Sequence, residues 1–258
     1  MQPVYDTIIF DLDGTLLNTL EDLKNSVNHA LSVMGFPTCT LEEVRLAVGN
    51  GARTLIRRVI PESAGDTAVE KTLSHFRTHY EAHCNDCTAP YNGILPMLDA
   101  LKSRGLRLAV VSNKPDAAVK TLCSLYFSKW IPVAIGEREN VRRKPAPDSV
   151  HAALRELNAS TAGPVPCVGS STNNGSASAS GGCTSVSGAP TSGGPADPPS
   201  VCRALYVGDS DVDIATAAAA GMDCVSVTWG FRSEAFLREH GASRIIHAPS
   251  ELLTQILS

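Results

Sequence analysis

The sequence predicts an α/β fold: a doubly wound, Rossmann-like parallel sheet with a helical subdomain inserted after the first strand. In residues 90–258, short apolar segments alternate with helical patterns. That order requires crossover helices and is typical of parallel sheets covered on both faces. Residues 18–89 show helical periodicity without a convincing strand, which indicates the inserted subdomain.

The first strand is expected within residues 4–10, which are β-rich and are followed by Asp-Gly-Thr, a turn signal. The helical subdomain follows in residues 18–89. Its first helix has apolar residues at spacings of three and four, and further helices are predicted at 41–47, 51–60 and 66–83. Residues 1–17 and 90–258 are therefore expected to form the core.

The remaining core elements alternate in type along the chain. The predicted helices cover residues 94–104, 115–126, 147–157, 211–220 and 233–239, and the predicted strands cover 106–111, 132–135, 204–207 and 223–227. Ligands of such sheets bind at the carboxyl ends of the strands, so polar residues there are candidate site residues.

Residues 160–201 interrupt this alternation. They are dominated by Ser, Gly, Ala, Thr and Pro, and Asp197 is their only charged residue. A segment of that composition cannot bury a core of its own, so we expect a disordered, low-complexity insertion in a surface loop of the core.

Composition limits the classes of partner. Hydrophobic residues make up 43% of the chain, enough to bury a core, and the net charge of -4 provides no basic surface for nucleic acid or an acidic membrane. No apolar run reaches the roughly 18 residues that span a bilayer. We therefore expect a cytoplasmic protein that acts on a small molecule, with its eight scattered cysteines reduced.

Asp11 and Asp13 follow the first strand, and Gly14 and Thr15 complete the turn. Two carboxylates at a strand end often only cap a turn. However, an aspartate can also attack phosphorus and form an acyl phosphate, while a second carboxylate supplies the proton that the leaving alkoxide needs.

Two further groups of polar residues precede predicted helices. Ser112 and Asn113 could hold a phosphate at a helix N-terminus or could simply cap the helix. Lys144 lies in a basic stretch where a helix begins, which is unfavourable for the helix dipole and suggests a bound anion; a solvated loop is the alternative.

A last acidic group, Asp209, Asp211 and Asp213, follows the strand at 204–207. Clustered carboxylates suit Mg²⁺, although acidic residues also stabilise the first turn of a helix without any metal. Four polar groups at four predicted strand ends are difficult to explain as independent caps.

In the order of these motifs, the chain resembles the haloacid dehalogenase superfamily, in particular its phosphatases with a helical C1-type cap. The resemblance implies that Asp11 is the nucleophile, Asp13 the general acid and base, and Lys144 the lysine that offsets charge on the phosphoryl group. It also implies phosphate contacts from Ser112, Asn113, Gly14 and Thr15, and Mg²⁺ bound by Asp11, Asp13 and Asp209 with support from Asp213.

Three shorter segments are similar to phosphoglycolate phosphatases: residues 48–52 (VGNGA), 91–93 (YNG) and 112–115 (SNKP). This similarity implies a Mg²⁺-dependent phosphomonoester hydrolase that acts on 2-phosphoglycolate, with Arg53 binding the substrate carboxylate. We expect a monomer or a homodimer. A phosphosugar mutase of the same superfamily and a non-catalytic sensor of phosphate-bearing ligands are the alternatives. Asn18 departs from the family, in which many members carry Asp at the cap hinge.

Overall fold

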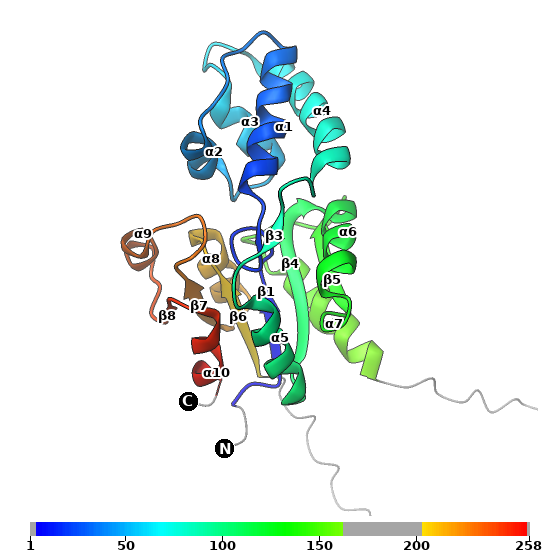
Figure 1. The fold of residues 1–258 in the computed structure, drawn as a ribbon, viewed down its shortest axis with the longest axis vertical. Coiled ribbons are helices and arrows are strands. Elements are labelled where there is room, and N and C mark those ends of the chain that lie inside the picture. The colour runs from blue at the N-terminus through cyan, green and yellow to red at the C-terminus, as the bar shows by residue number, and fades with distance from the viewer. Residues whose placement is uncertain (1–3, 162–202, 257–258) are drawn as a thin grey trace, which may run out of the picture.

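The computed structural model describes residues 4–161 and 203–256. Its centre is a six-stranded parallel sheet in the order β5-β4-β1-β6-β7-β8 (Figure 1). The strands are β1 (Thr7–Phe10), β4 (Arg107–Pro115), β5 (Val133–Glu137), β6 (Ala204–Gly208), β7 (Asp223–Val227) and β8 (Ile245–Ile246). The predicted fold class is confirmed.

Both faces of the sheet are covered because alternate residues of the buried strands point to opposite sides. Ile8 and Phe10 pack in a cluster with side chains of α5 (Ile94–Ser103), α6 (Asp116–Phe127) and α10 (Leu252–Gln255). Ile9 packs in a second cluster with α7 (Asp148–Thr161) and α8 (Asp211–Ala219). A short helix, α9 (Glu234–Glu239), and a 3₁₀ turn, η1 (Pro249–Glu251), complete the core.

A four-helix cap lies beyond the carboxyl edge of the sheet (Figure 1). It consists of α1 (Leu20–Val33), α2 (Leu41–Ala47), α3 (Ala52–Val59) and α4 (Asp66–His83), which bury a hydrophobic cluster of their own. The chain enters and leaves the cap through two paired antiparallel strands, β2 (Leu17–Asn18) and β3 (Ala89–Pro90). Asp22 of α1 secures the return by accepting hydrogen bonds from the backbone of Cys87 and Thr88.

The structure differs from the predictions in a few elements. The strand predicted to end at residue 111 continues to Pro115, past a register shift against β5, so polar residues 112–114 lie within a strand. The two-residue strands β2, β3 and β8 were not predicted, because they are too short to show a period. The helix predicted to end at residue 157 continues to Thr161, and the rest of the predicted insertion at 160–201 lies outside the described residues.

Within residues 4–161 and 203–256, no helix is both long and apolar enough to cross a membrane. The five cysteines in these ranges are free, including Cys84 and Cys87.

Candidate active site

The parallel register brings the predicted site residues to one edge of the sheet. Phe10 pairs with Val110 of β4 and with Val207 of β6, so the residues that follow these three positions meet beyond the strand ends. A cavity of about 70 Å³ lies between this edge and the cap. The core residues that line it include Asp11, Asp13, Ser112, Asn113, Lys114, Lys144 and Asp209.

Asp11 is buried directly after β1. Its Oδ1 accepts a hydrogen bond from the backbone N–H of Leu12 at 2.7 Å and lies 2.9 Å from the Lys144 ammonium. Burial, and then repulsion from Asp213, raise the pKa of Asp11 well above its ordinary value even though Lys144 lowers it. A carboxylate so poorly solvated has a strong tendency to bind a cation.

Lys144 lies between two carboxylates. Its Nζ is 2.9 Å from Asp11 and 2.8 Å from Asp213, and it donates to the hydroxyl of Tyr206 at 3.2 Å. Burial alone would lower the pKa of Lys144, but Asp11 and Asp213 raise it well above the ordinary value. The lysine therefore stays charged inside the protein.

The side-chain amide of Asn113 fixes the backbone that carries Lys144. Its Oδ1 accepts from the Lys144 N–H at 2.9 Å, and its Nδ2 donates to the Lys144 carbonyl at 3.0 Å. The same Nδ2 lies 3.2 Å from the carbonyl of Gly49 in the cap. Asn113 thus orients the lysine and contacts the cap. Ser112 lines the cavity, and its hydroxyl accepts a hydrogen bond from the Lys114 N–H at 3.2 Å.

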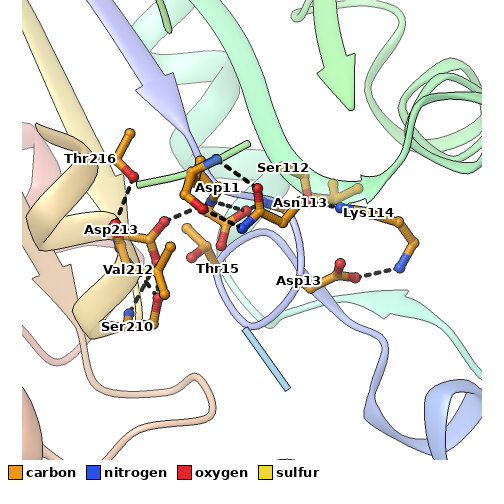
Figure 2. A network of polar contacts seen from close by, with 12 residues as sticks. Asp11, Asp13, Thr15, Ser112, Asn113, Lys114, Ser210, Val212, Asp213 and Thr216 are labelled. Carbon is orange, nitrogen blue, oxygen red and sulfur yellow. Dashed lines mark hydrogen bonds and ion pairs between the residues drawn. The ribbon is translucent and has the colours of Figure 1, made fainter. Parts of the chain in front are cut away.

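Asp209 and Asp213 belong to the loop and first turn after β6. Asp213 forms a capping box with Ser210 (Figure 2). The other carboxylate oxygen of Asp213 accepts from Lys144 at 2.8 Å. Asp209 accepts from the backbone N–H of Phe231 at 2.7 Å. Burial and repulsion from Asp213 raise the pKa of Asp209 to about 7.

These carboxylates are suited to a divalent cation. Oxygen atoms of Asp11, Asp209 and Asp213 lie within 4.8 Å of one another, all three residues are buried, and Lys144 is the only cation that pairs with this group among the described residues. Three acidic groups against one lysine leave uncompensated negative charge, and the ligands are hard oxygens of the kind that Mg²⁺ binds. Asp211 lies outside the group.

Gly14 and Thr15 contact Asp209 and are not among the residues that line the cavity. Gly14 has φ +82°, and a Cβ at this position would lie 2.3 Å from Oδ2 of Asp209. Thr15 donates its hydroxyl to Oδ1 of Asp209 at 3.3 Å. Both residues therefore shape the position of an acidic side chain, which differs from the direct phosphate contact that was expected.

Asp13 pairs with a lysine to which the sequence analysis gave no role. The Lys114 ammonium lies 2.6 Å from Oδ1 of Asp13, which also accepts from the hydroxyl of Thr19 at 2.6 Å. Burial would lower the pKa of Lys114, but Asp13 and then Tyr80 raise it above its ordinary value. In the view of Figure 2 this pair lies on the opposite side of Asp11 from Asp213.

The expected role of Arg53 is not supported by its position. Arg53 is exposed on α3, donates to Glu70 at 2.7 Å, and does not line the cavity, although its neighbours Gly51 and Ala52 do. A helix turns by about 100° per residue, so the side chain after Ala52 points away from the site.

Lys114, Tyr206 and Arg232 are site residues that sequence reasoning missed. Lys114 lies in the buried part of β4, and a charged residue in a buried strand was an available signal. Arg232 lies in the loop after β7 and had no local signal, because its partners are backbone carbonyls of the cap.

The comparisons agree with this geometry. The family model for haloacid dehalogenase-like hydrolases matches residues 8–187, and a second model of such hydrolases matches residues 141–255. A phosphoglycolate phosphatase of Rhodospirillum rubrum is 30% identical over 88% of this chain and 81% of its own length. One of Cereibacter sphaeroides is 30% identical over 87% and 86%.

Solved structures include the crystal structure of a protein from Lactobacillus delbrueckii subsp. bulgaricus that was assigned as a phosphoglycolate phosphatase. It has a TM-score of 0.80 and 31% identity, with both chains covered completely. The crystal structure of CbbY from Rhodobacter sphaeroides, solved in complex with phosphate, has a TM-score of 0.64 at 23% identity and is similar in fold.

Proposed function

We propose that this chain, which belongs to the haloacid dehalogenase-like hydrolases and is a phosphatase, hydrolyses a small phosphomonoester. In this proposal the reaction passes through a phosphoaspartate on Asp11. The observation that carries this proposal is the contact between the Asp11 carboxylate and the Lys144 ammonium at 2.9 Å, at the wall of a cavity that also exposes Asp13. A nucleophile, a cation and a second carboxylate then face one small space.

In the first step, a carboxylate oxygen of Asp11 attacks phosphorus as the bond from phosphorus to the ester oxygen breaks. Asp13 donates its proton to the leaving alkoxide. Lys144, fixed through its backbone by Asn113, offsets negative charge on Asp11 and on the phosphoryl oxygens, while the Ser112 hydroxyl donates to one of these oxygens.

In the second step, Asp13 removes a proton from a water molecule, whose oxygen attacks the phosphorus of the acyl phosphate. The bond between phosphorus and Asp11 breaks, and inorganic phosphate and the Asp11 carboxylate are formed. Apolar cap residues such as Leu55 and Phe76 line the cavity and limit access of bulk water.

Asp11 and Asp209 would hold Mg²⁺, with Asp213 positioning Lys144 beside them. Bound there, the ion would neutralise acidic groups and polarise the phosphoryl oxygens. The fit of the oxygen ligands and their excess negative charge support this assignment.

The small volume of the cavity and the names of the similar proteins support 2-phosphoglycolate as the substrate. The test is phosphate release by the purified protein, with and without Mg²⁺, from 2-phosphoglycolate, sugar phosphates, pyrophosphate and an aryl phosphate. We expect Mg²⁺-dependent release that is fastest with 2-phosphoglycolate and that is abolished in Asp11→Asn. Full turnover by Asp11→Asn would refute the phosphoaspartate, and no release from any ester would refute the proposed activity. A cytoplasmic location and a monomeric or homodimeric state remain predictions.

A further inference from the structure

The cavity contains two buried lysines, and only one of them lies beside the nucleophile. Lys144 is engaged by Asp11 and Asp213. Lys114, whose side chain is 2% exposed, serves neither of these carboxylates. A fixed cation is expensive to bury, so a second one at a substrate cavity needs a reason beyond the phosphate.

The surroundings of Lys114 include an unused hydrogen-bond donor. The ammonium lies 4.7 Å from the centre of the Tyr80 ring of α4, so a cap residue covers it. The Tyr80 hydroxyl is buried beside the Lys114 ammonium, and its own proton has no acceptor among the described residues. Both side chains line the cavity. A buried hydroxyl whose proton has no acceptor is costly, and a bound anion would accept it.

Lys114 also has spare capacity as a donor. Of its three N–H groups, one is directed to Asp13 at 2.6 Å and a second lies beside the Tyr80 hydroxyl, which leaves one for a ligand. When Asp13 holds the proton that it donates to the leaving group, the ammonium and the phenol hydroxyl form a small set of donors with a single positive charge, which matches a carboxylate better than a second, doubly charged phosphate.

We infer that Lys114 and Tyr80 form a second anion subsite, which binds a carboxylate carried by the substrate close to its phosphate ester. This inference rests on the proposed function, because it needs the phosphoryl group to lie at Asp11 and Lys144. The subsite replaces Arg53 as the recognition element for the carboxylate. It lies partly in the cap, so a substrate with this carboxylate contacts core and cap together.

The experiment compares 2-phosphoglycolate with 2-hydroxyethyl phosphate, which has a similar length but carries a neutral hydroxymethyl group in place of the carboxylate. For the Mg²⁺-loaded wild type we expect a higher kcat/KM for 2-phosphoglycolate. In Lys114→Met the ratio of the two kcat/KM values should fall by about 10- to 150-fold, the cost of one charged hydrogen bond, mainly through KM. The exposed Lys102→Met serves as the matched control and should keep the wild-type ratio.

If Lys114 only supported Asp13, Lys114→Met would lower kcat/KM equally for both substrates, mainly through kcat. That result would overturn the subsite. To separate binding from catalysis, the dissociation constants of both esters are measured calorimetrically in Asp11→Asn with and without Lys114→Met. We expect the preference for 2-phosphoglycolate to be lost when Lys114 is absent. Retention of the preference would overturn the inference.

Tyr80→Phe keeps the ring over Lys114 and removes only the hydroxyl, so it tests the subsite even if Lys114→Met folds poorly. We expect its ratio to fall by about 2- to 10-fold, as for one neutral hydrogen bond. An unchanged ratio would remove Tyr80 from the subsite. Equal turnover of both esters by the wild type would contradict the subsite and leave the phosphatase proposal intact, whereas release from neither ester would contradict the proposed function itself.

Discussion

Arg45 and Arg232 each donate to a backbone carbonyl in the segment that carries the other. The Arg232 guanidinium donates to the carbonyl of Arg45 at 2.8 Å and to that of Val48 at 2.7 Å, and the Arg45 guanidinium donates to the carbonyl of Phe231. The first belongs to helix α2 of the cap and the second to the loop after β7 of the core. These reciprocal contacts hold the cap over the cavity.

We therefore predict that Arg232→Gln weakens cap closure. Charged hydrogen bonds contribute about 1.5–3 kcal/mol each, so the closed arrangement should be disfavoured by roughly 10-fold or more. Steady-state kinetics should show a higher KM and a lower kcat/KM, and Arg45→Gln should act in the same direction. Arg238→Gln, which removes only the exposed pair with Glu234, is the control. Wild-type kinetics in Arg232→Gln would contradict a role in closure.

A second prediction concerns Lys144→Met. Removal of this ammonium leaves Asp11 and Asp213 buried without their cation, which costs about 3–5 kcal/mol for a buried ion pair. We expect a lower free energy of unfolding by urea denaturation and loss of phosphatase activity by at least about 10³-fold. The double variant Lys144→Met, Asp213→Asn should recover part of the stability and none of the activity. Activity within tenfold of wild type in Lys144→Met would contradict the role given to this lysine.

A third prediction follows from Asp209, whose pKa is raised to about 7 by burial and by Asp213. An unfolded aspartate ionises near pH 4, so between about pH 4 and 7 the folded protein binds more protons than the unfolded chain. The contribution of Asp209 to stability therefore falls as the pH rises through this range. In EDTA, the melting temperature of the wild type should drop more between pH 5.5 and pH 8 than that of Asp209→Asn.

Magnesium should reverse this trend. Metal ligands bind as carboxylates, so Mg²⁺ should raise the melting temperature more at pH 8 than at pH 5.5. The same measurement on Asp209→Asn should show a smaller increase at pH 8. Parallel pH profiles of the two proteins in EDTA would show that Asp209 is not the titrating group.

The fourth prediction separates backbone strain from a clash. Gly14→Ala would place a methyl group 2.3 Å from Asp209 at φ +82°, whereas Gly35→Ala has a similar φ of +71° and no atom within 4 Å. Backbone strain of about 1–2 kcal/mol should affect both variants. Thermal denaturation should therefore show a modest loss in Gly35→Ala with full activity. Gly14→Ala should lose more stability and most of its phosphatase activity; equal behaviour of the two variants would contradict the role of Gly14 in positioning Asp209.

The sequence predicted the fold class because alternating strands and helices are local patterns. The sequence also predicted that Asp11, Ser112, Lys144 and Asp209 lie close together, because parallel strands share one carboxyl edge. Residues whose role depends on the approach of the cap were not predicted. Arg53 was expected in the site but faces solvent beside Glu70, and Lys114 was part of a quoted motif without a role.

These failures have a common physical cause. The direction of a side chain on a cap helix depends on how that helix packs against the core, which involves contacts between residues far apart in the sequence. Asn113 meets Gly49 and Lys114 meets Tyr80 only after both parts have folded. Single-sequence patterns describe each element separately and carry no information about such contacts.

The pairing of Leu17 with Pro90 and of Asn18 with Ala89 has an evolutionary consequence. The chain enters and leaves the cap at adjacent positions. The length and sequence of the inserted segment therefore do not affect the spacing of the sheet strands. Selection can therefore substitute residues within the inserted segment, or replace the whole segment, while the residues at the strand ends keep the same acid-base chemistry. Remodelling of this one insert is therefore a route to a new substrate that leaves the sheet unchanged.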